Sequence, residues 1–211
     1  MLSLPMMYGL PKIHKENVPL RPIISTVNSV NYKLASWLAH HLTPFLNKIS
    51  GCHLINTIEF TEKIKNLNIY NKKLVSFDVD SLYTNVPVSE CLQLLEERLP
   101  ILNANLNTLP LPCDIFIKLI KICVNDCNFS YNNKFFKQIR GLPMGSPISP
   151  IIANLFMEIF ENNVLSDLSN SLICNWFRYI DDVFAVVPDN TDITHLNNLL
   201  NSYHNSIKFK F

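Results

Sequence analysis

An adjacent pair of acids, Asp181 and Asp182, lies between two apolar runs and limits what this chain can fold into. The runs, residues 173–180 and 183–187, are rich in β-branched and aromatic side chains, so each favours a strand. Two strands this close in sequence predict a hairpin with both aspartates in its tight turn. One Asp there is ordinary turn chemistry, but neighbouring carboxylates repel one another unless a cation offsets their charge. The pair therefore suggests a metal site.

A second acidic strand end strengthens the metal hypothesis. Residues 75–77 (Val-Ser-Phe) form an apolar strand that leads directly into Asp78. If the two strand ends pair side by side in one sheet, Asp78, Asp181 and Asp182 would surround one point. Magnesium prefers oxygen ligands and binds through one or two carboxylates plus substrate phosphates. Two such ions about 4 Å apart can activate a hydroxyl and stabilise a leaving phosphate.

Three segments together resemble the palm motifs of reverse transcriptases. They are residues 77–87 (Phe-Asp-Val-Asp-Ser-Leu-Tyr-Thr-Asn-Val-Pro), 141–147 (Gly-Leu-Pro-Met-Gly-Ser-Pro) and 179–182 (Tyr-Ile-Asp-Asp). The flanking residues 8–15 (Tyr-Gly-Leu-Pro-Lys-Ile-His-Lys) and 21–25 (Arg-Pro-Ile-Ile-Ser) are most similar to Penelope-like retroelements, a branch related to telomerase reverse transcriptase. The similarity extends over nearly the whole chain.

The resemblance implies roles for individual residues. Asp78, Asp181 and Asp182 would be catalytic and would hold two Mg²⁺ ions, or Mn²⁺ in their place, with the backbone carbonyl of Val79 as a further ligand. Tyr83 would be the aromatic gate beneath the sugar, because a flat ring leaves room for hydrogen but not for a 2′-hydroxyl. The residues implied to contact the incoming nucleotide or the template are Arg21, Lys12, Lys15, Met144 and Gly145.

The order of elements fits an α+β polymerase palm, a split βαβ, ferredoxin-like antiparallel sheet backed by helices, with partial fingers. Prolines exclude a helix from residues 1–25 and favour extended segments there. The elements predicted after them are strands at residues 74–78, 173–180, 183–187 and 207–211, helices at 29–49, 57–66, 88–99, 114–127, 148–168 and 191–203, and a hairpin at 128–138 turning at Asn132 and Asn133. We expect residues 1–72 to form partial fingers and residues 73–211 the palm with inserted fingers elements, with thumb and endonuclease domains absent.

Composition limits how the chain can bind nucleic acid. The formal net charge is +1 and 48% of residues are hydrophobic, as in an ordinary globular domain, so any basic surface must be local. Six scattered cysteines lack the short paired spacings of a zinc site and indicate reduced thiols. The sequence shows neither a secretory leader nor an apolar run of about 18 residues. We therefore expect an intracellular protein, with nucleus or cytoplasm undecided.

The resemblance implies an RNA-directed DNA polymerase that transfers nucleotides from a dNTP to a primer 3′-hydroxyl. Its partners would be an RNA template, a DNA primer and dNTP, without a membrane, and its oligomeric state stays open. Two alternatives remain: a truncated or domesticated RNA-binding module that keeps the palm without catalysis, and a nucleotide cyclase. A cyclase would have no use for the glycine loop at residues 141–147. Without a thumb, the chain would hold primer and template weakly.

Overall fold

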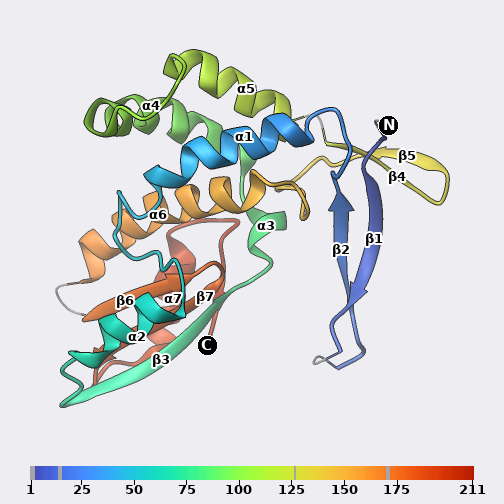
Figure 1. The fold of residues 1–211 in the computed structure, drawn as a ribbon. Coiled ribbons are helices and arrows are strands. Elements are labelled where there is room, and N and C mark those ends of the chain that lie inside the picture. Colours follow the sequence, from blue (N-terminus) through green and yellow to red (C-terminus); the bar gives the residue numbers. More distant parts are fainter. Residues whose placement is uncertain (1–2, 14–15, 126, 170–171) are drawn as a thin grey trace. The chain divides into compact units, whose positions relative to one another are not determined.

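The computed structural model describes residues 3–13, 16–125, 127–169 and 172–211. The chain forms two compact units, each built from two separate stretches of sequence. The first consists of Met1–Pro44 and Val86–Ala153, and the second of Phe45–Asn85 and Asn154–Phe211. Figure 1 shows the helices and strands of both. The division into fingers and palm at residue 72 stays a prediction.

The first unit contains a four-stranded sheet in the order β2-β1-β4-β5. Its strands are β1 (Met6–Pro11), β2 (Leu20–Ser25), β4 (Asn128–Tyr131) and β5 (Lys134–Lys137). The proline-rich N-terminal stretch is thus extended, as predicted. The predicted turn of the β4–β5 hairpin is confirmed, since Asn132 and Asn133 have φ of 48° and 58°. Asparagine tolerates this left-handed conformation, which two-residue hairpin turns require.

Most helices of the first unit lie between its two hairpins in the sequence. They are α1 (Tyr32–Leu42), α4 (Val88–Leu106), α5 (Cys113–Asn125) and the first turn of α6 (Ser149–Leu168). The helix predicted at residues 29–49 is shorter, because a 3-10 turn, η1 (Thr43–Phe45), follows α1. The helix predicted at residues 88–99 is longer and continues through Pro100.

The asparagine-rich segment after Pro100 falls between the helices predicted at residues 88–99 and 114–127, but it is helical. It is the last part of α4, which ends where Asn107 adopts a φ of 47° and donates its N–H to the Asn103 carbonyl at 2.6 Å. The Asn103 side chain also accepts the N–H groups of Thr108 and Leu109, each at 3.1 Å. Asparagine therefore ends the helix here and does not interrupt it, because its side chain satisfies backbone groups beyond the last turn.

The second unit contains the predicted antiparallel sheet, in the order β6-β7-β3-β8. Its strands are β3 (Lys72–Val79), β6 (Asn175–Tyr179), β7 (Asp182–Pro188) and β8 (Phe209–Lys210), and every neighbouring pair is antiparallel. The Leu54 N–H donates to the Arg178 carbonyl at 2.7 Å, and the Arg178 N–H to the Cys52 carbonyl at 2.8 Å. This short segment thus extends the sheet beyond β6.

Helices cover both faces of this sheet. The helices are α2 (Thr57–Lys65), α3 (Leu82–Asn85), α7 (Ile193–Ser202) and most of α6. On one face, Phe160 of α6 stacks on Phe209 at a centroid distance of 5.7 Å. On the other, the ring of Phe60 in α2 meets Phe177 and Phe184 edge to face. In the part of the chain that the structure describes, no helix is long and apolar enough to cross a membrane.

Candidate active site

The turn between β6 and β7 consists of Ile180 and Asp181. The prediction that Asp181 and Asp182 both lie in the turn is therefore wrong for Asp182, which is the first residue of β7 and pairs with Tyr179. Ile180 has a φ of 58°, which β-branched residues rarely adopt. A two-residue hairpin turn needs positive φ to match the twist of its strands. Ile180 therefore keeps this unfavourable backbone conformation because the turn requires it.

The register of the sheet brings the acidic strand ends together. Asp78 in β3 pairs directly with Asp182 in β7. One residue further on, the Val79 N–H donates to the Asp181 carbonyl at 2.9 Å. Residues directly opposite one another share a face, and Asp78 and Asp182 are both exposed. Like charges in such a pair are destabilising, so this end of the sheet favours a cation.

The donor chemistry of this cluster fits a hard divalent cation. Asp78, Asp181 and Asp182 offer carboxylate oxygens, and Val79 adds a carbonyl, which are the ligands that Mg²⁺ prefers. Among the residues described, no three His, Cys, Asp or Glu side chains are arranged as a ready metal cluster. On the other edge of β3, Asp78 pairs with Lys210, whose Nζ lies 2.8 Å from an oxygen of Asp80.

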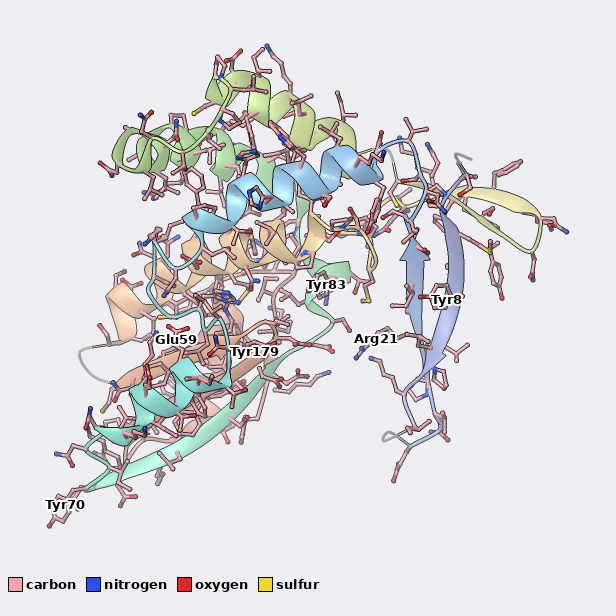
Figure 2. All side chains as sticks on the ribbon, viewed as in Figure 1. Tyr8, Arg21, Glu59, Tyr70, Tyr83 and Tyr179 are labelled. Atoms are coloured by element: carbon pink, nitrogen blue, oxygen red, sulfur yellow. The ribbon has the colours of Figure 1, made fainter. Side chains whose placement is uncertain are left out.

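Tyr83 lies in α3, the short helix that follows β3. Its ring is half-buried, and burial, together with the negative charge of Asp181, raises the pKa of its phenol. The Tyr83 phenol therefore lies close enough to Asp181 for the carboxylate charge to affect its pKa. Figure 2 labels Tyr83 together with Tyr179, the residue that precedes the turn.

A buried ion pair supports the turn. Arg178 of β6 has no exposed surface and donates to Glu161 at 2.7 and 3.2 Å and to the Asn154 side-chain carbonyl at 2.7 Å. One guanidinium nitrogen also donates to the Ile180 carbonyl at 3.0 Å. Because Ile180 is the residue with the left-handed φ, the guanidinium holds the strained residue next to Asp181 in place.

A second buried glutamate binds backbone N–H groups of residues 47–49, which follow η1. Glu158, one turn before Glu161 in α6, accepts the N–H of Asn47 and, at 3.1 Å, that of Ile49. Burial raises the pKa of the Glu158 carboxyl, and the two N–H donors act in the opposite direction. Glu161 also accepts from the Trp176 ring N–H at 2.9 Å. Glu161 therefore ties α6 to β6, the strand that leads into the turn, and Glu158 ties α6 to residues 47–49.

Sequence reasoning missed this network. A signal was present, since Glu158 and Glu161 interrupt the apolar run of the predicted helix at residues 148–168, and Arg178 lies within an apolar strand. Charged residues in such positions are rarely buried unless they are paired. Their partners, however, come from different elements and could not be named from the pattern.

The predicted nucleotide-contacting residues belong to the first unit, whereas the carboxylates and Tyr83 belong to the second. Arg21 is exposed on β2 (Figure 2). Lys12 is partly exposed just after β1. Lys15 lies outside the described residues. Met144 and Gly145 lie in a loop that docks on β2.

Two hydrogen bonds fasten this loop. The Ile24 N–H donates to the Met144 carbonyl at 2.8 Å, and the Thr26 hydroxyl to the Gly145 carbonyl at 2.9 Å. Gly145 has a φ of 128°, and a Cβ there would collide with the Ile24 carbonyl oxygen. Both the conformation and the close approach require glycine at this position.

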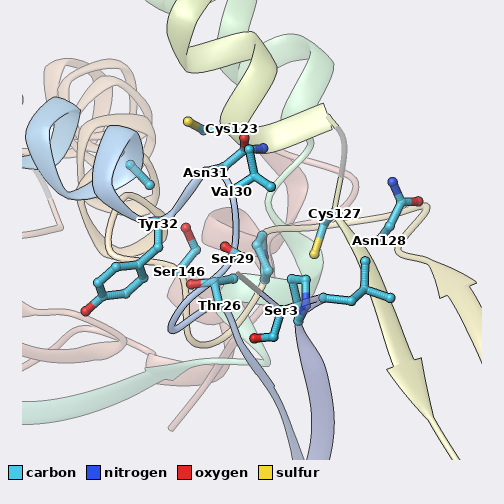
Figure 3. A pocket seen from close by; sticks show the side chains of 14 residues that line it. Ser3, Thr26, Ser29, Val30, Asn31, Tyr32, Cys123, Cys127, Asn128 and Ser146 are labelled. Atoms are coloured by element: carbon cyan, nitrogen blue, oxygen red, sulfur yellow. The ribbon is translucent and has the colours of Figure 1, made fainter. Parts of the chain in front are cut away.

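A cavity of about 350 Å³ lies beside the same loop (Figure 3). Its lining includes Thr26, Ser29, Tyr32, Cys123, Cys127 and Ser146. Burial raises the pKa of both the Cys123 and the Cys127 thiol to about 11. These thiols are therefore protonated at neutral pH and line the cavity as weak donors, without the reactivity of a thiolate.

We expect Gly145→Ala to lower the free energy of unfolding by about 2–4 kcal/mol, because a strained φ and a backbone collision add together. Gly51→Ala is the matched control, since Gly51 has a φ of +71° but nothing lies within 4 Å of a Cβ there. Only the conformational cost, about 1 kcal/mol, should apply to that variant. Urea unfolding of both variants measures the difference. Equal losses would show that the loop can move away from β2.

The family model for reverse transcriptase (RNA-dependent DNA polymerase) matches residues 13–211. The chain belongs to the reverse transcriptase family. The resemblance read from the palm motifs is thus confirmed at the level of the family, whose members are RNA-directed DNA polymerases and generally use divalent metal ions. No curated protein sequence matches the chain.

Solved polymerase structures share the fold of this reverse transcriptase chain. Telomerase from Candida albicans, in complex with a TWJ fragment of telomeric RNA, has a TM-score of 0.71 at 15% identity, over 99% of this chain and 42% of that one. Apo telomerase from Candida tropicalis has a TM-score of 0.72 at 14% identity, over 99% and 43%. The Sicinivirus 3Dpol RNA-dependent RNA polymerase has a TM-score of 0.62 at 12% identity, over 99% and 45%.

These likenesses confirm the predicted α+β, palm-like polymerase fold. The chain spans less than half the length of each of these three polymerases.

Proposed function

We propose that this chain is the fingers-and-palm part of a retroelement reverse transcriptase, most similar to the Penelope-like branch. It would extend a DNA primer on an RNA template by transferring nucleotides from dNTP. The observation that carries the proposal is the pairing of Asp78 with Asp182 at the sheet end where the Val79 N–H meets the Asp181 carbonyl. Three carboxylates on two adjacent strand ends supply the negative charge that a phosphoryl-transfer site uses to bind metal.

In this proposal Asp78, Asp181 and Asp182 hold the metal ions, with the carbonyl of Val79 as a further ligand. When bound, Mg²⁺ would lower the pKa of the primer hydroxyl and neutralise the departing pyrophosphate. The Tyr83 ring would lie beneath the sugar of the incoming nucleotide. The exposed Arg21 would pair with its triphosphate, because a guanidinium offers a planar fork of donors to phosphate oxygens.

A primer-extension assay on the 211-residue chain tests the function. The chain is given a DNA primer annealed to an RNA template, the four dNTPs and Mg²⁺, and products are resolved by length. Extension whose sequence follows the template supports the proposal. RNA binding without extension would indicate a non-catalytic module, and a cyclic nucleotide made without template would indicate a cyclase.

Removal of the Tyr83 ring should relax the choice of sugar. We expect Tyr83→Ala to raise incorporation of ribonucleotides relative to deoxynucleotides about 10- to 200-fold, the range for filling or opening space for one small group. Tyr83→Phe keeps the ring and should retain the wild-type preference, because the proposed exclusion is steric and does not use the hydroxyl. Single-turnover incorporation of UTP and dTTP opposite template adenine measures both. If Tyr83→Ala and Tyr83→Phe discriminate alike, the ring is not the gate.

A further inference from the structure

The cavity beside the glycine loop is lined by segments that lie far apart in the sequence. These are the N-terminal residues 3–5, residues 26 and 29–32 before and at the start of α1, residues 123, 127 and 128 around the end of α5, and Pro143 and Ser146 of the loop itself. All of them belong to the first unit. The cavity volume of about 350 Å³ lies in the range of small-molecule sites in proteins. The cavity therefore has room for a ligand and does not involve the acidic turn, which belongs to the second unit.

The lining of the cavity is uncharged. Its residues, as far as the structure describes them, include no Asp, Glu, Lys, Arg or His. Apolar surface comes from Leu4, Val30, Ala35 and Pro143, and the two thiols beside them are protonated. A charged ligand group would lose its hydration here without an oppositely charged partner, which is costly. The cavity therefore favours an uncharged ligand with an apolar body.

Helix α1 begins at the cavity, where Asn31, Tyr32 and Ala35 form part of the lining. Asn31 is the N-cap residue, and its side chain makes no capping hydrogen bond. In the described structure, no acceptor pairs with the N–H of Lys33 or Leu34. Such N–H groups in the first turn lack partners within the helix and are open to an outside acceptor. This end of the cavity therefore favours a hydrogen-bond acceptor.

Two buried serines supply further donors. Ser29 and Ser146 are 8% and 6% exposed, and both line the cavity (Figure 3). Turns use their backbone groups, since the Ser29 N–H donates to the Thr26 carbonyl at 2.9 Å and the Ser146 N–H to the Pro143 carbonyl at 3.3 Å. Among the described residues, neither hydroxyl has a hydrogen-bond partner in the protein. A buried hydroxyl without a partner is costly, so an acceptor that receives these hydrogen bonds is favoured.

We propose that this cavity binds a small uncharged molecule with an apolar ring and a carbonyl group that accepts hydrogen bonds from the Ser29 and Ser146 hydroxyls. Ser146 follows Gly145, and Thr26, which also lines the cavity, fastens the loop by donating to the Gly145 carbonyl. A ligand that contacts both sides therefore holds the glycine loop on β2. The binding uses no metal, nucleotide or template, so it does not depend on the proposed function.

NMR titration of the ¹⁵N-labelled chain with phenylacetamide tests the proposal. Phenylacetate and phenethylammonium have the same ring but carry a negative and a positive charge, and they should bind at least about tenfold more weakly. We expect Ser29→Ala to weaken phenylacetamide binding about 2- to 12-fold, the loss of one hydrogen bond. Ser146→Ala should have an effect of the same order.

Ser149→Ala is the matched control. Ser149 is 1% exposed in the first turn of α6, its hydroxyl has no partner among the described residues, and it does not line the cavity. This variant should change binding by less than about two-fold. Urea unfolding of each variant shows that the chain is folded in the titration.

Hydrogen exchange at the Ile24 N–H tests the effect on the loop, because this group donates to the Met144 carbonyl at 2.8 Å. A ligand that binds only the docked loop, at about ten times its Kd, should slow this exchange about tenfold. An unchanged rate with the cavity occupied would refute the effect on the loop.

Three results would overturn the binding site itself. They are the absence of saturable binding of phenylacetamide, equal weakening by Ser29→Ala and Ser149→Ala, and binding of phenylacetate or phenethylammonium as tight as that of phenylacetamide. Failure of primer extension alongside phenylacetamide binding that depends on Ser29 would refute the proposed function alone. Primer extension by a chain that does not bind phenylacetamide would refute this inference alone.

Discussion

Replacement of Asp181 by asparagine is expected to slow primer extension at least about 10³-fold, the equivalent of about 4 kcal/mol in the barrier. The exchange keeps the size of the side chain and removes the negative charge that would hold the metal. The free energy of unfolding should not fall, because one charge is lost from a cluster in which Asp78 already opposes Asp182. Single-turnover extension and urea unfolding measure the two quantities.

Asp189→Asn provides the matched control for this variant. Asp189 is exposed and lies just beyond the other end of β7. The substitution Asp189→Asn is therefore the same chemical change on the same hairpin, but away from Asp181 and its turn. The Asp189→Asn variant should extend primers at the wild-type rate. Added Mg²⁺ should also raise the melting temperature of the wild type and of Asp189→Asn more than that of Asp181→Asn, since an ion that binds only the folded state stabilises it. Full activity of Asp181→Asn would remove Asp181 from the mechanism.

Loss of the Arg178 guanidinium is expected to destabilise the chain by about 3–5 kcal/mol, the cost of leaving one partner of a buried pair uncompensated. Arg178→Met leaves Glu161 charged and buried, where it is 1% exposed. Urea unfolding monitored by tryptophan fluorescence measures the loss. Arg98→Met is the control, because Arg98 is exposed on α4 and the same substitution there should change stability by less than about 0.5 kcal/mol.

A double variant separates folding from support of the turn. In Arg178→Met with Glu161→Gln the buried charge is gone, and the glutamine can still accept from the Trp176 ring N–H. We expect this variant to recover part of the lost stability, with a remaining cost of about 1–3 kcal/mol. The Ile180 carbonyl would still lack its donor, so extension should stay at least about tenfold slow, from loss of one buried hydrogen bond at the site. Wild-type extension by the folded double variant would show that the turn holds its shape without the guanidinium.

Much of the fold was predictable because it depends on local patterns. Three patterns each predict the conformation of the residues that form them. They are the alternating strand that leads into Asp78, the apolar runs on either side of Asp181, and the two asparagines between short strands. The antiparallel sheet and the turn at Asn132 and Asn133 were predicted correctly for this reason. Motif order also indicated the reverse transcriptase family, which the family match confirms.

The errors lie where a neighbour in space outweighs the local pattern. α4 continues through Pro100 because Leu99 is fully buried and the proline lies on the exposed side of the helix. Proline costs the helix one hydrogen bond, but the packing of the apolar stripe offsets it. Asp182 joins β7 instead of the turn because it pairs with both Tyr179 and Asp78.

The sequence by itself indicated which residues to propose for the chemistry, since Asp78, Asp181 and Tyr83 stand out through the residues beside them. Only the tertiary structure decided how the acids meet, because strand register depends on side chains from distant parts of the chain. It also decided that Arg178 and Glu161 lie buried beneath the turn. A buried charge is stable only with its partner in place, and the partner is chosen by packing and not by position in the sequence.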